Sequence, residues 1–258
     1  MDLTPQNVTA WHNHTQSQHS TKRDEYSAKG FRTLSLSIYG SVQNPLFAAV
    51  MVKRPILVAT KQFGPTNQSG IQQSFDDMAA QGFGPYILSA TGPANSAVFV
   101  GVFTPMSSIP LTRLDLTGAE FAELNAQQQG KGRILLWADA FGTASDTRYT
   151  AIWGPNPSRQ AWSCDGIAET GSAYKARFDA LVSVWCRQTL VSITPGGRYL
   201  AVFADSTMGS WTARKDLTSS EYQDEYNKAT AKGLMPICVS GSGSGSSVNL
   251  AAIFADRD

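Results

Sequence analysis

Tyr199-Leu200-Ala201-Val202-Phe203 is the clearest copy of the short phrase that decides the fold of this chain. The phrase is an aromatic residue or Leu, then Ala or Gly two positions later, then a β-branched residue and usually a second aromatic. Its other copies lie at 47–51, 99–103, 149–153 and 250–254. The central small residues are numbers 49, 101, 151, 201 and 252, so the steps between them are 52, 50, 50 and 51 residues. This near-constant period indicates a five-unit internal repeat.

A second apolar stretch precedes each copy of the phrase. In the first unit, Leu34, Leu36 and Ile38 alternate with small polar residues, and period-two alternation of this kind predicts a half-buried strand. Turn-forming Gly, Pro, Asn and Ser separate this strand from the phrase, so each unit is predicted to hold a β-hairpin. The counterparts of the first strand lie at 85–89, 133–137, 189–193 and 236–240.

A polar stretch of helical character lies before each hairpin. Two of these stretches open with a capping box, Thr117-x-x-Glu120 and Thr218-x-x-Glu221, in which hydroxyl and carboxylate satisfy the first free amides of a helix. Three end near a glycine, at Gly30, Gly82 and Gly233, as a left-handed C-terminal cap requires. One unit is therefore predicted to be helix, strand, turn, strand.

The fold class that follows is an α/β (α+β) repeat domain over residues 1–258, with units at approximately 3–55, 56–110, 111–161, 162–211 and 212–258. The second strand is apolar on both faces, and its small residue leaves a notch into which a helix can press. Because one unit cannot cover both faces, neighbouring units must share a core. A ring about a pseudo-fivefold axis and an open stack both satisfy this requirement. We expect the ring, since no terminal unit has the polar outer face of an open stack.

Composition excludes two classes of function. The hydrophobic fraction is 42%, and no apolar run approaches the ~20 residues of a membrane span. Twenty-one Lys and Arg against twenty Asp and Glu give a net charge of +1, with no basic stripe interleaved with aromatics. We therefore expect no membrane and no nucleic acid among the partners.

The first residues, Met1-Asp2-Leu3-Thr4-Pro5, have neither the basic start nor the apolar stretch of a secretory signal. The chain is then either cytosolic or a form from which the signal has been removed. Three N-x-S/T sequons favour the second reading and make Asn7, Asn13 and Asn67 glycosylation candidates.

Three cysteines are too few for a disulfide scaffold and lack the paired spacing of a zinc site. Cys164 precedes and Cys186 ends the same predicted helical segment, so we expect these two to pair in an oxidising compartment. Cys238 lies inside a strand pattern and is expected to be a buried thiol.

One short motif resembles a catalytic dyad. Ser172-Ala173-Tyr174-Lys175 matches the S-x-x-K of serine β-lactamases and penicillin-binding proteins, in which a lysine activates the serine one helical turn away. The match opens the fourth repeat helix, where Ser172 is expected to be an N-cap, and the chain has neither K-T-G nor S-D-N. We therefore predict no catalytic role for this pair.

The three histidines, His12, His14 and His19, lie in one hydrophilic segment with no Asp or Glu among them before Asp24. We expect solvated surface there rather than a metal site. A Ser-His-Asp or Cys-His centre would have to recruit one of these three histidines, so we expect no such chemistry. The sequence thus predicts no catalytic residue, cofactor or metal.

The other candidate residues either recur in register with the repeat or depart from its pattern. The glycines of 241–245 lack a following Gly-Lys-Ser/Thr and stand where every unit has its hairpin turn, so we expect a turn. Trp162 and Trp211 follow the small residue of the preceding strand by 11 and 10 positions and are expected in the core. The breaks in the pattern make a specific surface at Trp137, Asp139, Trp185 and Arg187 the remaining candidate site.

Taken together, the stretch from Ser74-Phe75-Asp76 to Thr91-Gly92 and the phrase at 97–103 resemble a known repeat. It is the module found in front of the β-lactamase-like catalytic domain of polyglycine hydrolases, which are secreted fungal serine proteases. Matching phrases at Phe178-Asp179, at 226–233 and in the five Ala/Gly strands extend the likeness over nearly the whole chain.

The resemblance implies that the enzyme cuts Gly-Gly bonds in the linker of plant defence chitinases, with serine and lysine supplied by a C-terminal domain whose motifs are absent here. This chain would then be the non-catalytic N-terminal half, ending at Asp258 where the catalytic part begins. Its expected partners are that catalytic domain and the chitinase, and its expected location is extracellular. The alternative is a free-standing extracellular binding module, lectin-like, that binds protein or glycan through its hairpin loops.

Overall fold

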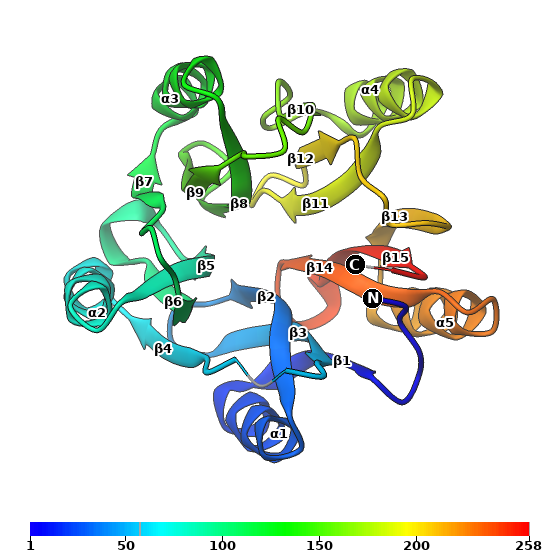
Figure 1. Cartoon of the computed structure of the whole chain (residues 1–258), viewed down its shortest axis with the longest axis horizontal. Coiled ribbons are helices and arrows are strands. Elements are labelled where there is room, and N and C mark those ends of the chain that lie inside the picture. Colours follow the sequence, from blue (N-terminus) through cyan, green and yellow to red (C-terminus); the bar gives the residue numbers. More distant parts are fainter. Residues whose placement is uncertain (57, 258) are drawn as a thin grey trace. The chain divides into compact units, whose positions relative to one another are not determined.

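The computed structural model describes residues 1–56 and 58–257, and it contains two compact units. Unit 1 combines Met1–Val58 with Thr207–Asp258, and unit 2 is Ala59–Ser206. Every repeat in both units is a three-stranded antiparallel sheet with one helix packed on it. Within each unit the helices lie on the outer side of their sheets (Figure 1).

Unit 1 holds the first and the last repeat. The first is β1 (Val8–Thr15), α1 (Gln16–Ala28), β2 (Phe31–Gly40) and β3 (Pro45–Lys53), with strand order β1-β3-β2. The last is β13 (Trp211–Leu217), α5 (Ser219–Thr230), β14 (Met235–Ser242), the short helix η2 (Gly245–Ser247) and β15 (Asn249–Ala255), with order β13-β15-β14.

Unit 2 holds the three middle repeats, with the same strand order in each. The second repeat is β4 (Lys61–Thr66), α2 (Gln68–Ala79), β5 (Phe83–Thr91), η1 (Ala94–Ser96) and β6 (Val98–Pro105). The third is β7 (Leu111–Leu116), α3 (Gly118–Gly130), β8 (Arg133–Gly142) and β9 (Thr147–Pro155). The fourth is β10 (Trp162–Ser163), α4 (Gly171–Ser183), β11 (Arg187–Ile193) and β12 (Tyr199–Ala204).

The predicted helix and hairpin are present in every repeat, but the prediction missed one strand per unit. Each sheet begins with a strand that precedes its helix: β1, β4, β7, β10 or β13. These strands form one edge of their sheets and are largely half-exposed, so they do not alternate between apolar and polar residues. Four of them also carry a register shift, as between Arg113 and Leu116, which disrupts the period further.

The recurring phrase forms the central strand of each sheet, which explains why it is apolar on both faces. The small residue leaves the notch that the sequence predicts. A Cβ added at Gly101 would lie 3.1 Å from Ile71 Cδ1 of α2 and 2.8 Å from the Phe103 ring. Close packing of helix on sheet therefore depends on the small side chain at this position.

One buried side chain anchors each helix to its sheet, and it is always the fourth helical residue. These anchors are His19, Ile71, Phe121, Tyr174 and Tyr222. Each lies four positions after the helix N-cap, which is Thr15, Asn67, Thr117, Thr170 and Thr218 in turn, and each cap side chain accepts a hydrogen bond from a backbone N–H of the first turn. The predicted capping boxes at Thr117 and Thr218 are confirmed.

Neighbouring repeats share their cores inside each unit. In unit 1 one cluster joins Val50 and Val52 of β3 to Ala252 and Phe254 of β15. In unit 2 another joins Leu88 and Phe99 of the second repeat to Phe141 and Ile152 of the third. Closure of all five repeats about a fivefold axis stays a prediction.

The boundaries of the five sequence units stay predictions; β13 begins at Trp211, one residue before the predicted start of the fifth unit. The second predicted sequence unit includes Leu57 and the fifth includes Asp258, and both residues lie outside the described residues. Among the residues that the structure describes, no helix combines the length and the apolarity needed to cross a membrane.

Candidate functional site

One strand position in the hairpins carries polar side chains between neighbouring repeats. It follows the residue that pairs with the small residue of the phrase, and its occupants are Ser37, Ser89, Asp139, Ser192 and Ser240. All five are buried. Four of the five repeats have a serine at this position, and the third repeat has Asp139 instead.

Asp139 joins three consecutive repeats of unit 2. Its Oδ2 accepts hydrogen bonds from Ser89 Oγ at 2.5 Å and from the Ala90 backbone N–H at 3.1 Å, both in β5. Its Oδ1 accepts from Ser192 Oγ at 2.7 Å, in β11. Ser192 Oγ in turn accepts from the Ala140 backbone N–H at 3.0 Å. A carboxylate fits this place because its two oxygens can accept from both neighbours at once.

Burial governs the charge of this carboxyl group. Loss of hydration raises the pKa of Asp139 to about 6, and the hydrogen bonds from Ser89, Ser192 and the two backbone amides only partly offset that rise. All of these partners are neutral. A perturbed pKa often marks a reactive group. Here, however, the carboxyl lies inside the repeat junction with its oxygens bonded, so we assign it a structural role.

In unit 1, serine hydroxyls accept the hydrogen bonds between the two repeats. Ser37 Oγ accepts from the Gly241 backbone N–H at 3.1 Å. Ser35 Oγ, two residues earlier, accepts from the Val239 N–H at 3.0 Å. The backbone N–H of Gly241 in the last repeat thus donates to the first repeat. In the same way, the Ala90 N–H donates to Asp139 and the Ala140 N–H donates to Ser192. One hydrogen-bond pattern thus joins neighbouring repeats in both units.

Trp137, a predicted surface candidate, belongs to the same junction. Its indole Nε1 donates to the Leu88 carbonyl at 3.0 Å, and its ring packs against the core shared by the second and third repeats. Thr150 Oγ1 donates to the same carbonyl at 3.0 Å. The structure therefore places Trp137 and Asp139 between repeats rather than on a free surface.

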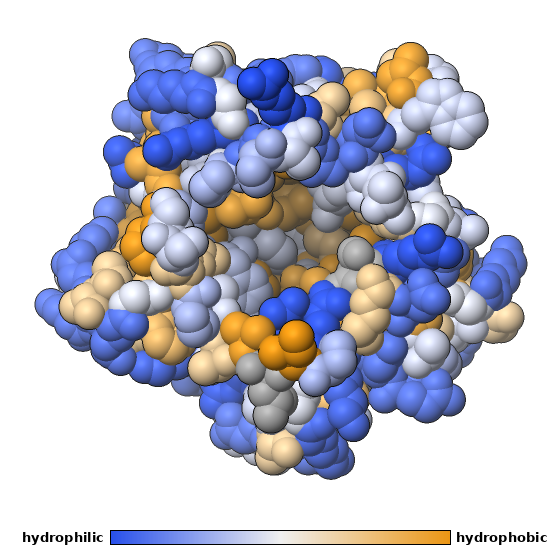
Figure 2. All heavy atoms as spheres, viewed as in Figure 1, coloured by the Kyte–Doolittle hydropathy of each residue, from blue (hydrophilic) through white to orange (hydrophobic). Residues whose placement is uncertain are grey.

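Trp185 and Arg187 lie elsewhere: Trp185 is in the turn from α4 to β11, and Arg187 is the first residue of β11. The Trp185 side chain is 76% exposed, and the Arg187 guanidinium lies 5.9 Å from the centroid of its indole ring. The surface over α2 and α3 is mostly hydrophilic, whereas an apolar patch marks the corner at α4 (Figure 2). The four candidates thus separate into a buried pair and an exposed pair.

Ser172 and Lys175 do not form a dyad. Lys175 Nζ binds both oxygens of Asp179, at 2.6 and 2.5 Å, on the exposed side of α4. Ser172 Oγ lies 3.2 Å from Thr170 Oγ1. The prediction that Ser172 caps this helix is wrong, because Thr170 accepts from the Ala173 N–H and is the N-cap. Because Lys175 binds Asp179 and Ser172 contacts Thr170, this pair lacks the geometry of an activated nucleophile.

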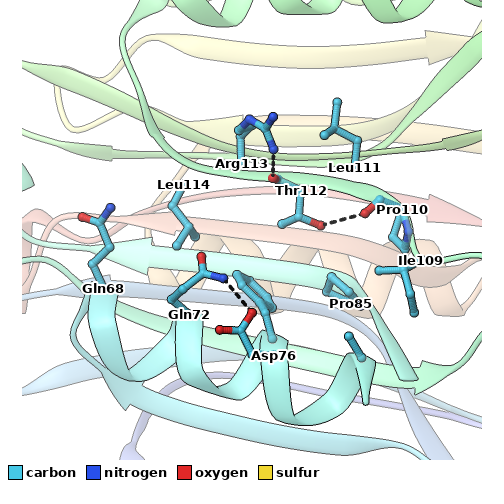
Figure 3. Close-up of a pocket in the computed structure, with 12 residues that line it drawn as sticks. Gln68, Gln72, Asp76, Pro85, Ile109, Pro110, Leu111, Thr112, Arg113 and Leu114 are labelled. Carbon is cyan, nitrogen blue, oxygen red and sulfur yellow. Dashed lines mark hydrogen bonds between the residues drawn. The ribbon is translucent and has the colours of Figure 1, made fainter. Parts of the chain in front are cut away.

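A groove of about 490 Å³ runs between α2 and the stretch that leads into β7 (Figure 3). Phe75, Pro85 and Ile109 give it apolar walls. Asp76 and Gln72 line the α2 side, where Gln72 Nε2 donates to Asp76 Oδ1 at 3.2 Å. Arg113 lies opposite, with its guanidinium donating to the Thr112 carbonyl at 2.9 Å. The lining therefore combines apolar walls with a carboxylate on one side and a guanidinium on the other.

The sequence pattern of one known family, described as the polyglycine hydrolase-like structural repeat, matches four stretches: residues 6–54, 67–106, 111–156 and 209–257. These stretches lie in the first, second, third and fifth repeats, with β4 of the second repeat left out, and they cover more than half of the chain. The chain belongs to the polyglycine hydrolase-like structural repeat family. The resemblance noted from the sequence is thereby confirmed for the repeat itself.

The fourth repeat is the one that the family pattern does not match. It has the shortest first strand, β10, with two residues, and an irregular stretch replaces the usual direct entry into the helix. It also carries Trp185 and Arg187 as well as two of the cysteines. Departure from the family pattern is therefore concentrated in one repeat.

The expectation that the three histidines form solvated surface is wrong for His19. His19 is the buried helix anchor of the first family repeat, stacked on Phe47 with ring centroids 4.5 Å apart and accepting from Trp11 Nε1 at 3.2 Å. His12 lies edge-on to the Tyr222 ring at 4.7 Å, and burial lowers its pKa. The signal that could have identified His19 is its place four residues after Thr15, in register with the other anchors.

The predicted disulfide between Cys164 and Cys186 is also wrong: all three cysteines are free thiols. Cys164 follows β10 and Cys186 precedes β11, and these two strands flank β12 on opposite sides. Strands two places apart are separated by about 9 to 10 Å, beyond the ~7 Å Cα limit of a disulfide. Burial raises the pKa of the Cys164 thiol well above its usual range, so this cysteine is a weak nucleophile.

The three sequon asparagines differ in their surroundings. Asn67 is exposed, and its Oδ1 caps α2 by accepting from the Gly70 N–H at 2.9 Å. Asn7 Nδ2 donates to the Asp2 carbonyl at 3.1 Å. Asn13 Nδ2 donates to Ser219 Oγ of the last repeat, and its Oδ1 accepts from Tyr39. A glycan on Asn13 would displace the bond to Ser219, so Asn67 is the most accessible candidate; glycosylation itself stays a prediction.

The remaining features are part of the repeat. The predicted turn at 241–245 is only partly present, because Gly241 is still paired with Leu250 in β14, Gly243 lies in the connection to β15, and Gly245 begins η2. Trp162 is buried, with its Nε1 donating to the Arg133 carbonyl at 3.1 Å, while Trp211 is only half-buried. Within residues 1–56 and 58–257, no group of three His, Cys, Asp or Glu side chains could hold a metal ion.

Proposed function

We propose that this chain is the non-catalytic structural repeat domain of a secreted serine-type endopeptidase of the polyglycine hydrolase kind. In this proposal a β-lactamase-like catalytic domain of the same protein cuts Gly-Gly bonds in the linker of plant defence chitinases. The repeat domain supports that catalytic domain and contributes to recognition of the chitinase. The observation that carries the proposal is the family membership of four repeats.

The side chains that could supply chemistry support the same proposal, because each has a structural task. Lys175 is bound by Asp179, His19 anchors a helix, and Asp139 accepts hydrogen bonds from two neighbouring repeats. A serine peptidase needs a nucleophile within hydrogen-bond reach of a base. The one sequence motif of that kind, Ser172 with Lys175, lacks this geometry.

The secreted location is supported by the exposed sequon at Asn67, whose side chain can keep its capping hydrogen bond through Oδ1 while Nδ2 carries a glycan. Expression in a eukaryotic secretion host, followed by intact mass with and without deglycosylation, tests this part. A mass loss on deglycosylation that disappears in Asn67→Gln supports it. Secreted protein without any glycan would contradict the use of this sequon.

The main experiment incubates three samples with a chitinase that carries a glycine-rich linker: this chain alone, the chain fused to a β-lactamase-like catalytic domain of the family, and that domain alone. We expect cleavage only where the catalytic domain is present, and faster cleavage in the fusion. Cleavage by the chain alone that is lost in Ser172→Ala and kept in Ser183→Ala would overturn the proposal. Binding to a glycan array without affinity for the chitinase would favour the lectin-like alternative.

A further inference from the structure

In the fourth repeat, the residue at which the chain leaves helix α4 has a strained backbone conformation. In the other four repeats this position is a glycine with positive φ: Gly30 at 84°, Gly82 at 75°, Gly132 at 70° and Gly233 at 77°. In the fourth repeat it is Trp185, with φ of 70°. This left-handed conformation is unfavourable for a residue with a Cβ, and such outliers cluster at functional positions.

The strain is not offset by internal packing. Trp185 is 76% exposed and its neighbour Val184 is 62% exposed, which makes Trp185 the most exposed large hydrophobic residue of the part of the chain that the structure describes. The Arg187 guanidinium lies 5.9 Å from the centroid of its ring. We name Val184, Trp185 and Arg187 the Trp185 knob. It combines a flat apolar ring with a positive charge, the residue types that dominate binding hot spots.

A receptor of matching chemistry is present in the same unit. The groove between α2 and β7 has a volume of about 490 Å³ and apolar walls that include Ile109, which is 44% exposed (Figure 3). The Asp76 carboxylate lies exposed on its α2 side. Arg113 lies on the opposite side, so a cation that enters the groove is drawn toward α2 and repelled from β7.

We propose that the Trp185 knob of one copy of this chain inserts into the α2–β7 groove of a second copy. Trp185 fills the apolar part of the groove, and Arg187 pairs with Asp76. Because knob and groove are different surfaces, the contact is head-to-tail, and each added copy leaves one knob and one groove free. Association is therefore weak and open-ended rather than a closed dimer. The proposal is independent of the proposed function.

Sedimentation equilibrium of the unglycosylated chain from a bacterial host tests the proposal, since this protein carries no glycan at Asn67 beside the groove. We expect the average mass to rise with concentration, from the low micromolar to the millimolar range. Trp185→Gly restores the glycine of the other repeats and should weaken association at least tenfold while raising the melting temperature. Ile56→Ala, which removes another strongly exposed apolar side chain in unit 1, is the matched control and should change nothing.

A charge swap tests the partner surfaces. Arg187→Asp and Asp76→Arg should each self-associate poorly, whereas their equimolar mixture should recover the wild-type association, because each knob then meets a groove of opposite charge. A wild-type chain that stays monomeric, a Trp185→Gly variant that still associates, or a mixture that fails to recover would each overturn the proposal. Loss of association in Trp185→Gly without any effect of Asp76→Arg would overturn the groove as the binding surface.

Discussion

Neighbouring repeats are joined by different side chains in the two units. A serine hydroxyl accepts the hydrogen bond from the next repeat in unit 1, and an aspartate carboxylate accepts it in unit 2. In unit 1, Ser37 accepts a backbone N–H from Gly241 of the neighbouring repeat. In unit 2, Asp139 takes the same place and accepts from Ser89, Ala90 and Ser192 together. The hydroxyl links two repeats, while the carboxylate links three.

This difference shows what the repeat requires. A buried backbone N–H at the edge of one hairpin needs an acceptor from the next hairpin, and any side chain of the right reach can supply it. The carboxylate supplies more hydrogen bonds, but it carries the cost of a buried charge. The two junctions should therefore respond differently to truncation and to pH.

The largest expected effect is that of Asp139→Ala. It leaves Ser89 and Ser192 without their acceptor and the Ala90 N–H unpaired in the interior, so we expect a loss of roughly 2–4 kcal/mol in the free energy of unfolding at neutral pH. Chemical denaturation measures it, with the exposed Asp77→Ala as control. A loss no larger than that of the control would show that Asp139 does not hold the repeats together.

The unit 1 junction should be less sensitive. Ser37→Ala removes one acceptor and leaves the Gly241 N–H unpaired, which should cost roughly 1–2 kcal/mol of unfolding free energy. The same denaturation experiment, with the exposed Ser17→Ala as control, measures this value. If Ser37→Ala costs as much as Asp139→Ala, the contrast between the two junctions disappears.

The pH dependence separates carboxylate from hydroxyl. The folded-state pKa of Asp139 is about 6, above the value near 3.8 of the unfolded chain, so the folded state takes up the proton first. This group therefore adds stability as pH falls, by roughly 1 kcal/mol between about pH 7 and pH 5. Asp139→Asn should remove that gain. A wild-type chain and a variant with identical pH profiles over this window would contradict the buried carboxyl.

The smallest expected effect concerns Trp137, which also binds across a unit 2 junction. Trp137→Phe keeps an aromatic ring against the shared core but removes the donor to the Leu88 carbonyl. That carbonyl still accepts from Thr150, so the cost should be only about 0.5–1.5 kcal/mol. Trp137→Phe combined with Thr150→Val should cost more than the two single changes together, because the carbonyl then loses both donors.

The sequence predicts the part of the fold that depends on periodicity. The apolar phrases locate the five central strands, and Thr117 and Thr218 with their glutamates locate two helix starts to the residue. The first strand of each sheet escapes prediction because it is a half-exposed edge strand, and it is either interrupted by a register shift or, in β10, only two residues long. The anchor His19 escapes because histidine is usually a surface residue, and only comparison with Ile71 and Phe121 reveals the shared register.

The candidate site is predicted only in part. Breaks in the repeat pattern do mark Asp139 and Trp185, but the sequence does not distinguish a buried junction from an exposed turn. That distinction depends on which strand lies beside β8, and this is a long-range contact that no local pattern encodes. The predicted disulfide failed for a related reason: Cys164 and Cys186 follow β10 and precede β11, which lie on opposite sides of β12.

A double-mutant cycle between Asp139 and Ser192 tests most directly the claim that these side chains join neighbouring repeats. The two residues come from the third and fourth repeats, and Ser192 Oγ lies 2.7 Å from Asp139 Oδ1. The cycle measures the unfolding free energies of the wild-type chain, Asp139→Ala, Ser192→Ala and the double variant at neutral pH. We predict a coupling energy on the order of 1–2 kcal/mol between the two residues. Single-variant losses that simply add, within about 0.3–0.5 kcal/mol, would contradict the claim.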